Sequence, residues 1–294
     1  MAKRALVLGG GGPVGIAWEA GLLAGLAAGG ADLSSADLIL GTSAGSFVGA
    51  QIALGRSAVS LSEAILAEAQ RPPAPRGPGA GPPADLSPLM TLFERAWSGE
   101  EDPTAVRREI GALALSTKTM SEDDFLASFG RSLSEKGGDA WPDRDFRCTA
   151  VDAETGEFIV WDRAAKVGIS RAVASSCSVP GVYPPITIHG RRYIDGGMRS
   201  GTNGDLAKGC DKVALIALRI GGEDGRAQRM ARRLDKEIAV LRAGGAHVEL
   251  MLPDPDSSGA FGANLMDFRR RPAACRAGEA QGRALAERLA AFWS

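Results

Sequence analysis

The sequence Gly41-Thr42-Ser43-Ala44-Gly45 follows an apolar run at residues 38–40 and precedes a helix-like segment at residues 46–54. A serine flanked by glycines, at a sharp turn from a strand into a helix, is the setting of a nucleophile elbow. Glycines are needed there because the strand and the helix nearly touch. The N-terminus of the helix also favours developing negative charge. The motif makes Ser43 a candidate nucleophile, although an ordinary turn with a capping serine has the same pattern.

A glycine-rich segment at residues 9–15 precedes the elbow, between an apolar run at residues 5–8 and a helix pattern at residues 16–28. One function for such a loop is dinucleotide binding, which also requires an acidic residue at the end of the second strand. Asp37 lies at the beginning of that strand instead. We therefore expect no nucleotide cofactor, and a nicotinamide-dependent oxidoreductase is disfavoured.

The other function for the glycine-rich segment is an oxyanion hole, in which backbone N–H groups bind a tetrahedral intermediate. Pro13 has no N–H, so the donors must come from the amides of Gly11, Gly12, Val14 and Gly15. Four consecutive glycines are more than a tight turn needs, which favours this function. Gly11, Gly12 and Gly15 are the candidate oxyanion-hole residues.

The bulk composition is that of a globular protein, because 45% of the 294 residues are hydrophobic and 23% are charged. This length fits one large α/β domain or two small ones, and we expect a single domain over residues 1–294. The formal net charge is −1, and only 5% of the residues are aromatic. Neither a basic surface nor a set of stacking platforms is indicated, so nucleic acid is not an expected partner.

The cysteines and the apolar runs bear on the cellular compartment. The four cysteines are scattered, without a C-x-x-C pair or a neighbouring histidine: Cys148, Cys177, Cys210 and Cys275. This pattern argues against a zinc site or a disulfide framework. The apolar run at residues 5–8 is too short for a signal peptide, and no run approaches the ~18 residues of a membrane span. We therefore expect a cytoplasmic protein without a bound metal.

The sequence pattern predicts strands and helices along much of the chain. Strands are expected at residues 5–8, 38–40, 146–151, 157–161, 186–188, 192–194, 213–218 and 248–252. Helices are expected at residues 16–28, 46–54, 57–70, 89–97, 103–115, 121–133, 167–174, 226–242 and 272–292. A Pro/Gly-rich loop at about residues 71–88 is either a lid or an exposed insertion, and a helical insert at about residues 89–135 follows it.

Four motifs occur in one order: the glycine-rich segment, the Ser43 elbow, Ser175-Ser176-x-x-x-Pro180, and Asp195-Gly196-Gly197. With these residues the chain resembles the patatin-like phospholipases, from residue 6 to about residue 203 and more weakly beyond. The resemblance implies a three-layer α/β/α fold around a mainly parallel sheet. It also implies a Ser-Asp dyad in place of a catalytic triad.

By this resemblance Ser43 is the nucleophile, Asp195 is the general base, and the backbone of Gly11 and Gly12 forms the oxyanion hole. A serine hydroxyl needs a neighbouring base, and partial burial can raise the pKa of an aspartate enough to make it one. The expected reaction is hydrolysis of a lipid carboxylic ester through an acyl-enzyme. Phospholipid, lysophospholipid, acylglycerol and soluble ester are all compatible substrates, and transient contact with a membrane surface is a further expectation.

Two residues depart from the family pattern. Val14 stands where the family often has Arg or Lys, which removes a fixed positive charge near the oxyanion or a phosphate head group, and Ser175 stands where it often has Ala. Because of Val14, a catalytically inactive lipid-binding regulatory protein is one alternative. A Ser-Asp-His hydrolase that uses His247 is another, because the chain order Ser43, Asp195, His247 permits it.

Overall fold

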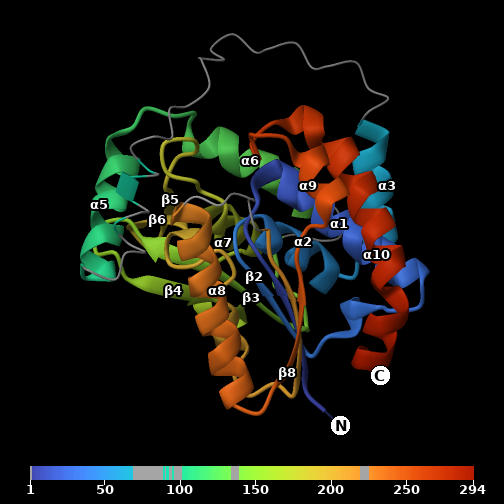
Figure 1. Ribbon diagram of the computed structural model, residues 1–294. Coiled ribbons are helices and arrows are strands. Elements are labelled where there is room, and N and C mark those ends of the chain that lie inside the picture. Colours follow the sequence, from blue (N-terminus) through green and yellow to red (C-terminus); the bar gives the residue numbers. More distant parts are fainter. Residues whose placement is uncertain are drawn as a thin grey trace.

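The computed structural model describes residues 2–68, 89, 91, 92, 95, 101–133, 139–218 and 225–294. Within these ranges one sheet lies between helices on both of its faces (Figure 1). Its strands are β1 Arg4–Leu8, β2 Leu38–Gly41, β3 Asp145–Asp152, β4 Phe158–Trp161, β5 Ile186–Ile188, β6 Arg191–Asp195, β7 Lys212–Ile216 and β8 His247–Met251. The α-helices are α1 Gly12–Ala28, α2 Ala44–Ala53, α3 Ala58–Glu68, α5 Pro103–Ser116, α6 Glu122–Leu133, α7 Ile169–Ser176, α8 Gly225–Ala243, α9 Pro255–Phe261 and α10 Arg271–Trp293.

The strands follow the order β5-β6-β3-β2-β1-β7-β8, and β4 also pairs with β3. β1, β2, β3, β7 and β8 run parallel to one another. β4 and β6 are antiparallel to β3, and β5 is antiparallel to β6. Parallel neighbours need a crossover connection, which α1 supplies between β1 and β2. The expected mainly parallel sheet is confirmed.

Both faces of the sheet are buried, because successive side chains of a strand point to opposite sides. In β1, Leu6 and Leu8 belong to the core cluster that includes side chains of α1, α2, α7 and α10. Ala5 and Val7 belong to a second core cluster, together with Ile238 and Leu241 of α8. Figure 1 shows α1, α3 and α10 on one side of the sheet and α8 on the other. The three-layer α/β/α architecture is therefore confirmed.

Helix α1 is covered on almost every side, as its nearly continuous apolar sequence requires. It packs closely on α10, where a Cβ on Gly21 would lie only 2.0 Å from the carbonyl oxygen of Cys275. One residue of α1 does not fit this apolar setting, because Glu19 has no exposed surface. The close packing positions α1, whose N-terminal end lies at the site described below.

Two helices begin two or more residues earlier than the sequence pattern predicts. α1 begins at Gly12 and not at residue 16. Pro13 fits the first helical turn, where a backbone N–H would have no helical partner to lose. α2 begins at Ala44 and not at residue 46. Both differences bring a helix N-terminus closer to Ser43 than the sequence pattern implies.

Some expectations fall outside the described residues. The Pro/Gly-rich loop at about residues 71–88 lies there entirely. Of the helix expected at residues 89–97, residues 89, 91, 92 and 95 are described, and all four are helical. The four cysteines are free and buried. In the described part of the chain, every helix is too short or too polar to cross a membrane.

Candidate active site

The turn between β2 and α2 holds Ser43 in a strained backbone conformation, with a φ of 53° and a ψ of −118°. Close packing requires both glycines of the motif. A Cβ on Gly41 would lie 2.3 Å from the Cα of Ser46, and one on Gly45 would lie 2.2 Å from the carbonyl oxygen of Leu8. Side chains there would push the strand and the helix apart. The backbone therefore makes the sharp turn that the motif predicts, and such strain is typical of functional turns.

Strand pairing brings Asp195 to the level of Ser43. Gly41, the last residue of β2, pairs with Cys148 of β3. Two residues further along β3, Ala150 pairs with Asp195, the last residue of β6. Ser43 also follows Gly41 by two residues, so the serine and the aspartate lie at the same height relative to the sheet. The register of three strands thus brings together two residues that are far apart in the sequence.

The Asp195 carboxyl group lies close enough to the Ser43 side chain for the hydroxyl group to lower its pKa. Its Oδ1 accepts the N–H of Gly197 at 2.7 Å. Asp195 is 2% exposed and Ser43 is 6% exposed. Burial raises the pKa of Asp195 to about 7, and the Ser43 side chain and the Gly197 N–H limit the rise. A carboxyl group with a pKa near neutrality can both accept and return a proton.

The glycine-rich loop leads into α1 at the pocket that also contains Ser43. The N–H groups of Gly11 and Gly12 have no hydrogen-bond partner among the residues that the structure describes. The Gly15 N–H, by contrast, donates to the carbonyl oxygen of Gly11 at 2.8 Å as the helix begins. Gly11 and Gly12 therefore remain the available donors, whereas the Gly15 amide is already used. The N–H of Ala44, which lies outside the glycine-rich segment, also has no partner within the described ranges.

The segment at the end of α7 fixes the backbone of Ser43. The Ser43 N–H donates to Oγ of Ser176 at 3.1 Å. The Ser43 carbonyl oxygen accepts the Cys177 thiol at 3.1 Å and the Ser46 hydroxyl at 2.6 Å. Burial raises the pKa of the Cys177 thiol, which keeps the thiol protonated and able to donate. These bonds stabilise the strained turn, a role that the motif containing Ser176 did not reveal.

The two departures from the family pattern differ in their structural meaning. Ser175 donates to a carbonyl oxygen of its own helix at 2.7 Å and accepts from Nε1 of Trp161 at 3.0 Å, so it stabilises α7. Val14 is buried in α1. A positive charge is nevertheless present nearby, because Arg271 of α10 donates to the carbonyl oxygen of Pro13 at 3.3 Å. No local sequence signal connects residues so far apart.

Asn203 connects the two halves of the site. Its side-chain nitrogen lies 3.0 Å from Oγ1 of Thr42 and 3.2 Å from the carbonyl oxygen of Gly196. Thr42 immediately precedes Ser43, and Gly196 immediately follows Asp195. Asn203 is fully buried and has a φ of 50°, in the left-handed region. It therefore positions the serine and the aspartate relative to each other.

Neither histidine lies near the serine. β8 begins at His247 and ends at Met251, which lies at the level of Gly41 across β7 and β1. His247 is four residues away from that end, or about 13 Å along the strand. His189 is exposed in the β5–β6 hairpin, with Nε2 at 3.1 Å from the carbonyl oxygen of Ala165. This separation rules out the alternative Ser-Asp-His triad with His247.

The requirements of the other site types are also not met. Asp37 accepts the Arg4 N–H at 2.7 Å at the beginning of β2, which is the wrong end for binding a ribose. Among the described residues, no group of three His, Cys, Asp or Glu side chains could hold a metal ion.

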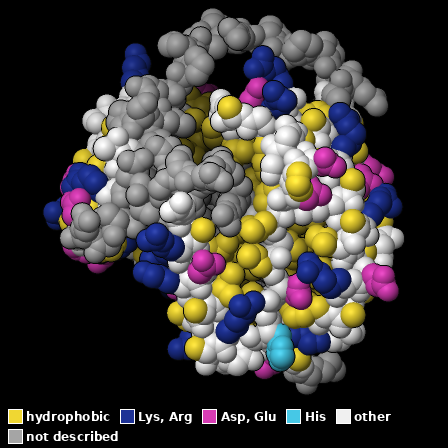
Figure 2. Space-filling view, in the orientation of Figure 1, with side chains coloured by type: hydrophobic (Ala, Val, Ile, Leu, Met, Phe, Trp, Pro, Cys, Tyr) yellow, Lys and Arg dark blue, Asp and Glu magenta, His cyan; other side chains and the backbone are white. Residues whose placement is uncertain are grey.

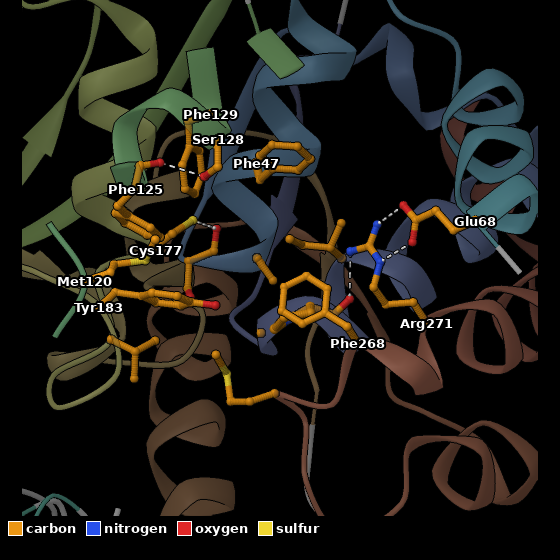
Figure 3. A pocket seen from close by; sticks show the side chains of 17 residues that line it. Phe47, Glu68, Met120, Phe125, Ser128, Phe129, Cys177, Tyr183, Phe268 and Arg271 are labelled. Atoms are coloured by element: carbon orange, nitrogen blue, oxygen red, sulfur yellow. Dashed lines mark hydrogen bonds and ion pairs between the residues drawn. The ribbon is translucent and has the colours of Figure 1, made fainter. Parts of the chain in front are cut away.

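A cavity of about 530 Å³ opens at Ser43 (Figure 3). Its size is within the usual range for ligand pockets, and its wall is mostly apolar. The wall consists of Gly12, Pro13, Ile16, Ser43, Ala44, Phe47, Glu68, Met120, Phe125, Ser128, Phe129, Cys177, Val179, Tyr183, Met266, Phe268 and Arg271. Figure 2 shows hydrophobic side chains lining a recess in the upper part of the molecule. A hydrocarbon chain is the kind of group that such a wall accepts.

A serine elbow in a three-layer α/β/α fold, open to an apolar pocket, is typical of hydrolases that act on hydrophobic esters. A family model described as patatin-like phospholipase matches residues 6–207, which is more than half of the chain. The chain therefore belongs to the patatin-like phospholipase family, and it is a hydrolase that acts on lipid ester bonds.

Two solved structures are similar over almost the whole chain. VipD from Legionella pneumophila has 13% sequence identity and a TM-score of 0.46, over 98% of this chain and 67% of that chain. The type III effector protein ExoU has 15% identity and a TM-score of 0.45, over 98% of this chain and 53% of that chain. This chain thus spans about two thirds of the one and about half of the other. No curated protein matches it.

Proposed function

We propose that this chain is a serine acyl hydrolase that cleaves carboxylic esters of lipids through an acyl-enzyme, with Ser43 as nucleophile and Asp195 as general base. The proposal depends on one observation: the Ser43 side chain contacts a buried carboxyl group whose pKa is raised to about 7. An aspartate with an ordinary pKa is a weak base, whereas a pKa near 7 suits proton transfer at neutral pH.

In the first half of the reaction, Asp195 takes the hydroxyl proton as Oγ of Ser43 attacks the ester carbonyl carbon. The N–H groups of Gly11 and Gly12 bind the oxyanion of the tetrahedral intermediate, and the N-termini of α1 and α2 stabilise its negative charge. Asp195 then returns the proton to the alcohol oxygen as the carbon–oxygen bond breaks. The alcohol leaves, and the acyl group remains on Ser43.

In the second half, Asp195 takes a proton from a water molecule that attacks the acyl-enzyme. The same N–H groups bind the second oxyanion. When this intermediate collapses, Oγ of Ser43 recovers its proton from Asp195, and the fatty acid is released. Each proton that Asp195 accepts is therefore returned within the same half-reaction.

A fluorophosphonate probe tests the nucleophile, because it reacts with activated serines. We expect the probe to label the wild-type protein and not the Ser43→Ala variant, and we expect only the wild type to hydrolyse a panel of p-nitrophenyl esters. His247→Ala serves as the matched control and should retain activity within about twofold, since His247 is remote from the pocket. Equal labelling of Ser43→Ala, or a large loss in His247→Ala, would contradict the dyad.

We also propose that the rim of the pocket makes transient contact with a lipid surface. Phe268 is 60% exposed and Met120 is 46% exposed, and both line the pocket. Large apolar side chains exposed beside a substrate pocket suit contact with acyl chains. Phe268→Ser should lower hydrolysis of a vesicle-borne ester several-fold more than hydrolysis of a dissolved ester. Val240→Ser, which removes an exposed apolar side chain from α8, is the control, and an equal effect of the two substitutions would refute the contact.

A further inference from the structure

The pocket is chemically uneven, because its formal charges lie together at one end. Of the described residues that line it, Glu68 and Arg271 are the ones with a charged side chain at neutral pH. Figure 3 shows this pair at one end of the pocket, with Phe125 and Tyr183 at the other. We call Glu68 and Arg271 the charged limb.

A continuous series of aromatic rings, which we call the aromatic limb, runs from the middle of the pocket to the opposite end: Phe47, Phe129, Phe125 and Tyr183. The ring centroids of Phe47 and Phe129 are 5.7 Å apart, those of Phe129 and Phe125 are 5.0 Å apart, and those of Phe125 and Tyr183 are 4.4 Å apart. The rings come from α2, from α6 and from the segment after α7. This limb can bury methylene groups of a substrate, and each buried methylene group increases the binding affinity about fourfold.

Ser43 lies between the two limbs. On one side its carbonyl oxygen accepts the thiol of Cys177, which lies beside Phe125 and Tyr183 in Figure 3. On the other side, the glycine-rich loop continues into Pro13, whose carbonyl oxygen accepts a hydrogen bond from Arg271. An ester bound at Ser43 therefore has one limb on each side of its carbonyl group.

The charged limb is anchored, yet it can still form hydrogen bonds. Nε and Nη2 of Arg271 donate to the two carboxylate oxygens of Glu68 at 2.8 and 2.9 Å, and Nη1 donates to Pro13. A guanidinium has five N–H groups, so two remain without a partner among the described residues. The Glu68 carboxylate, whose side chain is 39% exposed, retains lone pairs that can accept. The pair has no net charge and offers both donors and acceptors.

We propose that the two limbs orient the ester: the acyl chain occupies the aromatic limb, and the leaving alcohol, a polyol with free hydroxyl groups, binds the charged limb. This inference depends on the proposed function, because it assigns the two sides of the same ester. Hydroxyl groups both donate and accept, so they match the remaining N–H groups of Arg271 and the lone pairs of Glu68. An acyl chain at that end would desolvate the ion pair without forming a hydrogen bond.

A pair of substrates measures this preference, namely a 1-monoacylglycerol and the propyl ester of the same fatty acid. They have the same acyl chain and three alcohol carbons, and they differ in two hydroxyl groups. We expect the wild type to prefer the glycerol ester by about 10-fold or more in kcat/KM, since a site built to bind hydroxyl groups rejects the analogue that lacks them. Ser43-dependent hydrolysis without this preference would refute the inference and leave the proposed function intact. Absence of any Ser43-dependent hydrolysis would refute the proposed function instead.

The double variant Arg271→Met/Glu68→Leu replaces the ion pair with apolar side chains, a change that folded proteins often tolerate. We expect the preference for the glycerol ester to fall to about twofold or less, whereas the preferred acyl length should not change. The control is Arg283→Ala/Glu279→Ala, which removes another ion pair of α10 outside the pocket wall and should change neither property. If the double variant fails to fold, Glu68→Gln gives the same comparison with a smaller expected decrease.

The reciprocal test is Phe129→Leu, which removes a ring from the aromatic limb. We expect the acyl-length preference to shift, measured as the ratio of kcat/KM between glycerol esters of long and short acyl chains, while the glycerol-to-propyl ratio stays within about twofold of wild type. The opposite pattern would overturn the assignment. If the ion-pair variant altered the acyl preference and Phe129→Leu altered the alcohol preference, the ester would bind in the reverse direction.

Discussion

Asp195 and Glu19 are both carboxyl groups with almost no exposed surface, but their surroundings differ. Asp195 lies beside the Ser43 side chain and accepts the Gly197 N–H, whereas neither Glu19 oxygen has a hydrogen-bond partner among the described residues. The backbone of Gly9 approaches Glu19 and offsets part of its pKa rise, yet the Gly9 N–H already donates to Ile216 at 3.0 Å.

Burial raises the pKa of both carboxyl groups, so a raised pKa by itself does not identify a catalytic base. The feature that separates them is what each carboxyl group contacts. Asp195 meets a hydroxyl group at the wall of an open pocket, while Glu19 lies inside a helix that is covered on almost every side. The comparison therefore predicts that only one of these carboxyl groups takes part in the reaction.

The largest expected effect is on turnover. Asp195→Asn keeps the shape of the side chain and removes the base, so kcat/KM for a p-nitrophenyl ester should fall by about 10³- to 10⁴-fold. Glu19→Gln makes the same chemical change at the other carboxyl group and should retain activity within about threefold. A comparable loss in both variants, with both folded by circular dichroism, would remove the distinction between the two sites.

The dependence of activity on pH sharpens the comparison. The proposed mechanism needs Asp195 deprotonated, and its pKa is about 7 in the folded protein. Below that value kcat/KM should therefore fall about tenfold per pH unit, and above it the rate should level off. Between pH 5 and pH 8 the kcat/KM of the wild type should rise about 100-fold, and the kcat/KM of Glu19→Gln should follow the same pH profile. A profile that is flat from pH 5 to pH 8 would show that Asp195 is not the titrating base.

Asn203 positions Asp195, and no residue does the same for Glu19 among those described. Asn203→Leu keeps a similar side-chain size but removes the hydrogen bonds to Thr42 and Gly196. We expect kcat to fall about 10- to 100-fold with a smaller change in KM, because the dyad geometry changes more than the pocket does. An unchanged kcat in the folded variant would mean that the strand register alone holds the dyad.

The smallest expected effect is on stability. The folded protein keeps protons on both carboxyl groups at pH values where the unfolded chain has released them. The contribution of these two protonated carboxyl groups to the free energy of unfolding is therefore fully present below the ordinary pKa of about 4. It declines as the pH rises toward the raised pKa. The free energy of unfolding of Asp195→Asn minus that of the wild type should increase by about 1–3 kcal/mol from pH 4 to pH 8. Urea unfolding at each pH measures this difference.

Glu19→Gln should shift the free energy of unfolding in the same direction. This variant tests the effect of burying a carboxyl group that has no role in the proposed reaction. If neither variant flattened the pH dependence of the wild type, both carboxyl groups would have ordinary pKa values in the folded protein.

Much of the fold and half of the candidate site could be predicted from local sequence. The elbow at Ser43 requires glycines at 41 and 45, and this requirement is visible in five consecutive residues. Asp195, however, was identified by resemblance, because its approach to Ser43 depends on the register of three strands. No local pattern encodes such a register.

Other parts of the site could not be predicted for definable reasons. Gly15 was expected to donate to the oxyanion, but α1 begins four residues earlier than its apolar pattern, which uses the Gly15 amide within the helix. The ion pair of Glu68 and Arg271 joins residues 203 positions apart, so it exists only after α3 and α10 have packed on α1. Contacts of this kind depend on tertiary structure and have no short-range signal.

The wall of the pocket is assembled from two separate stretches of the polypeptide. Ser43 and Asp195 lie within residues 6–207, the part that matches the family model, whereas Met266, Phe268 and Arg271 come from beyond it. On the proposed mechanism, substitutions in this later stretch would change the choice of ester without altering the reacting groups. Mutation can thus diversify selectivity in one segment of the gene while the chemistry is inherited unchanged in another.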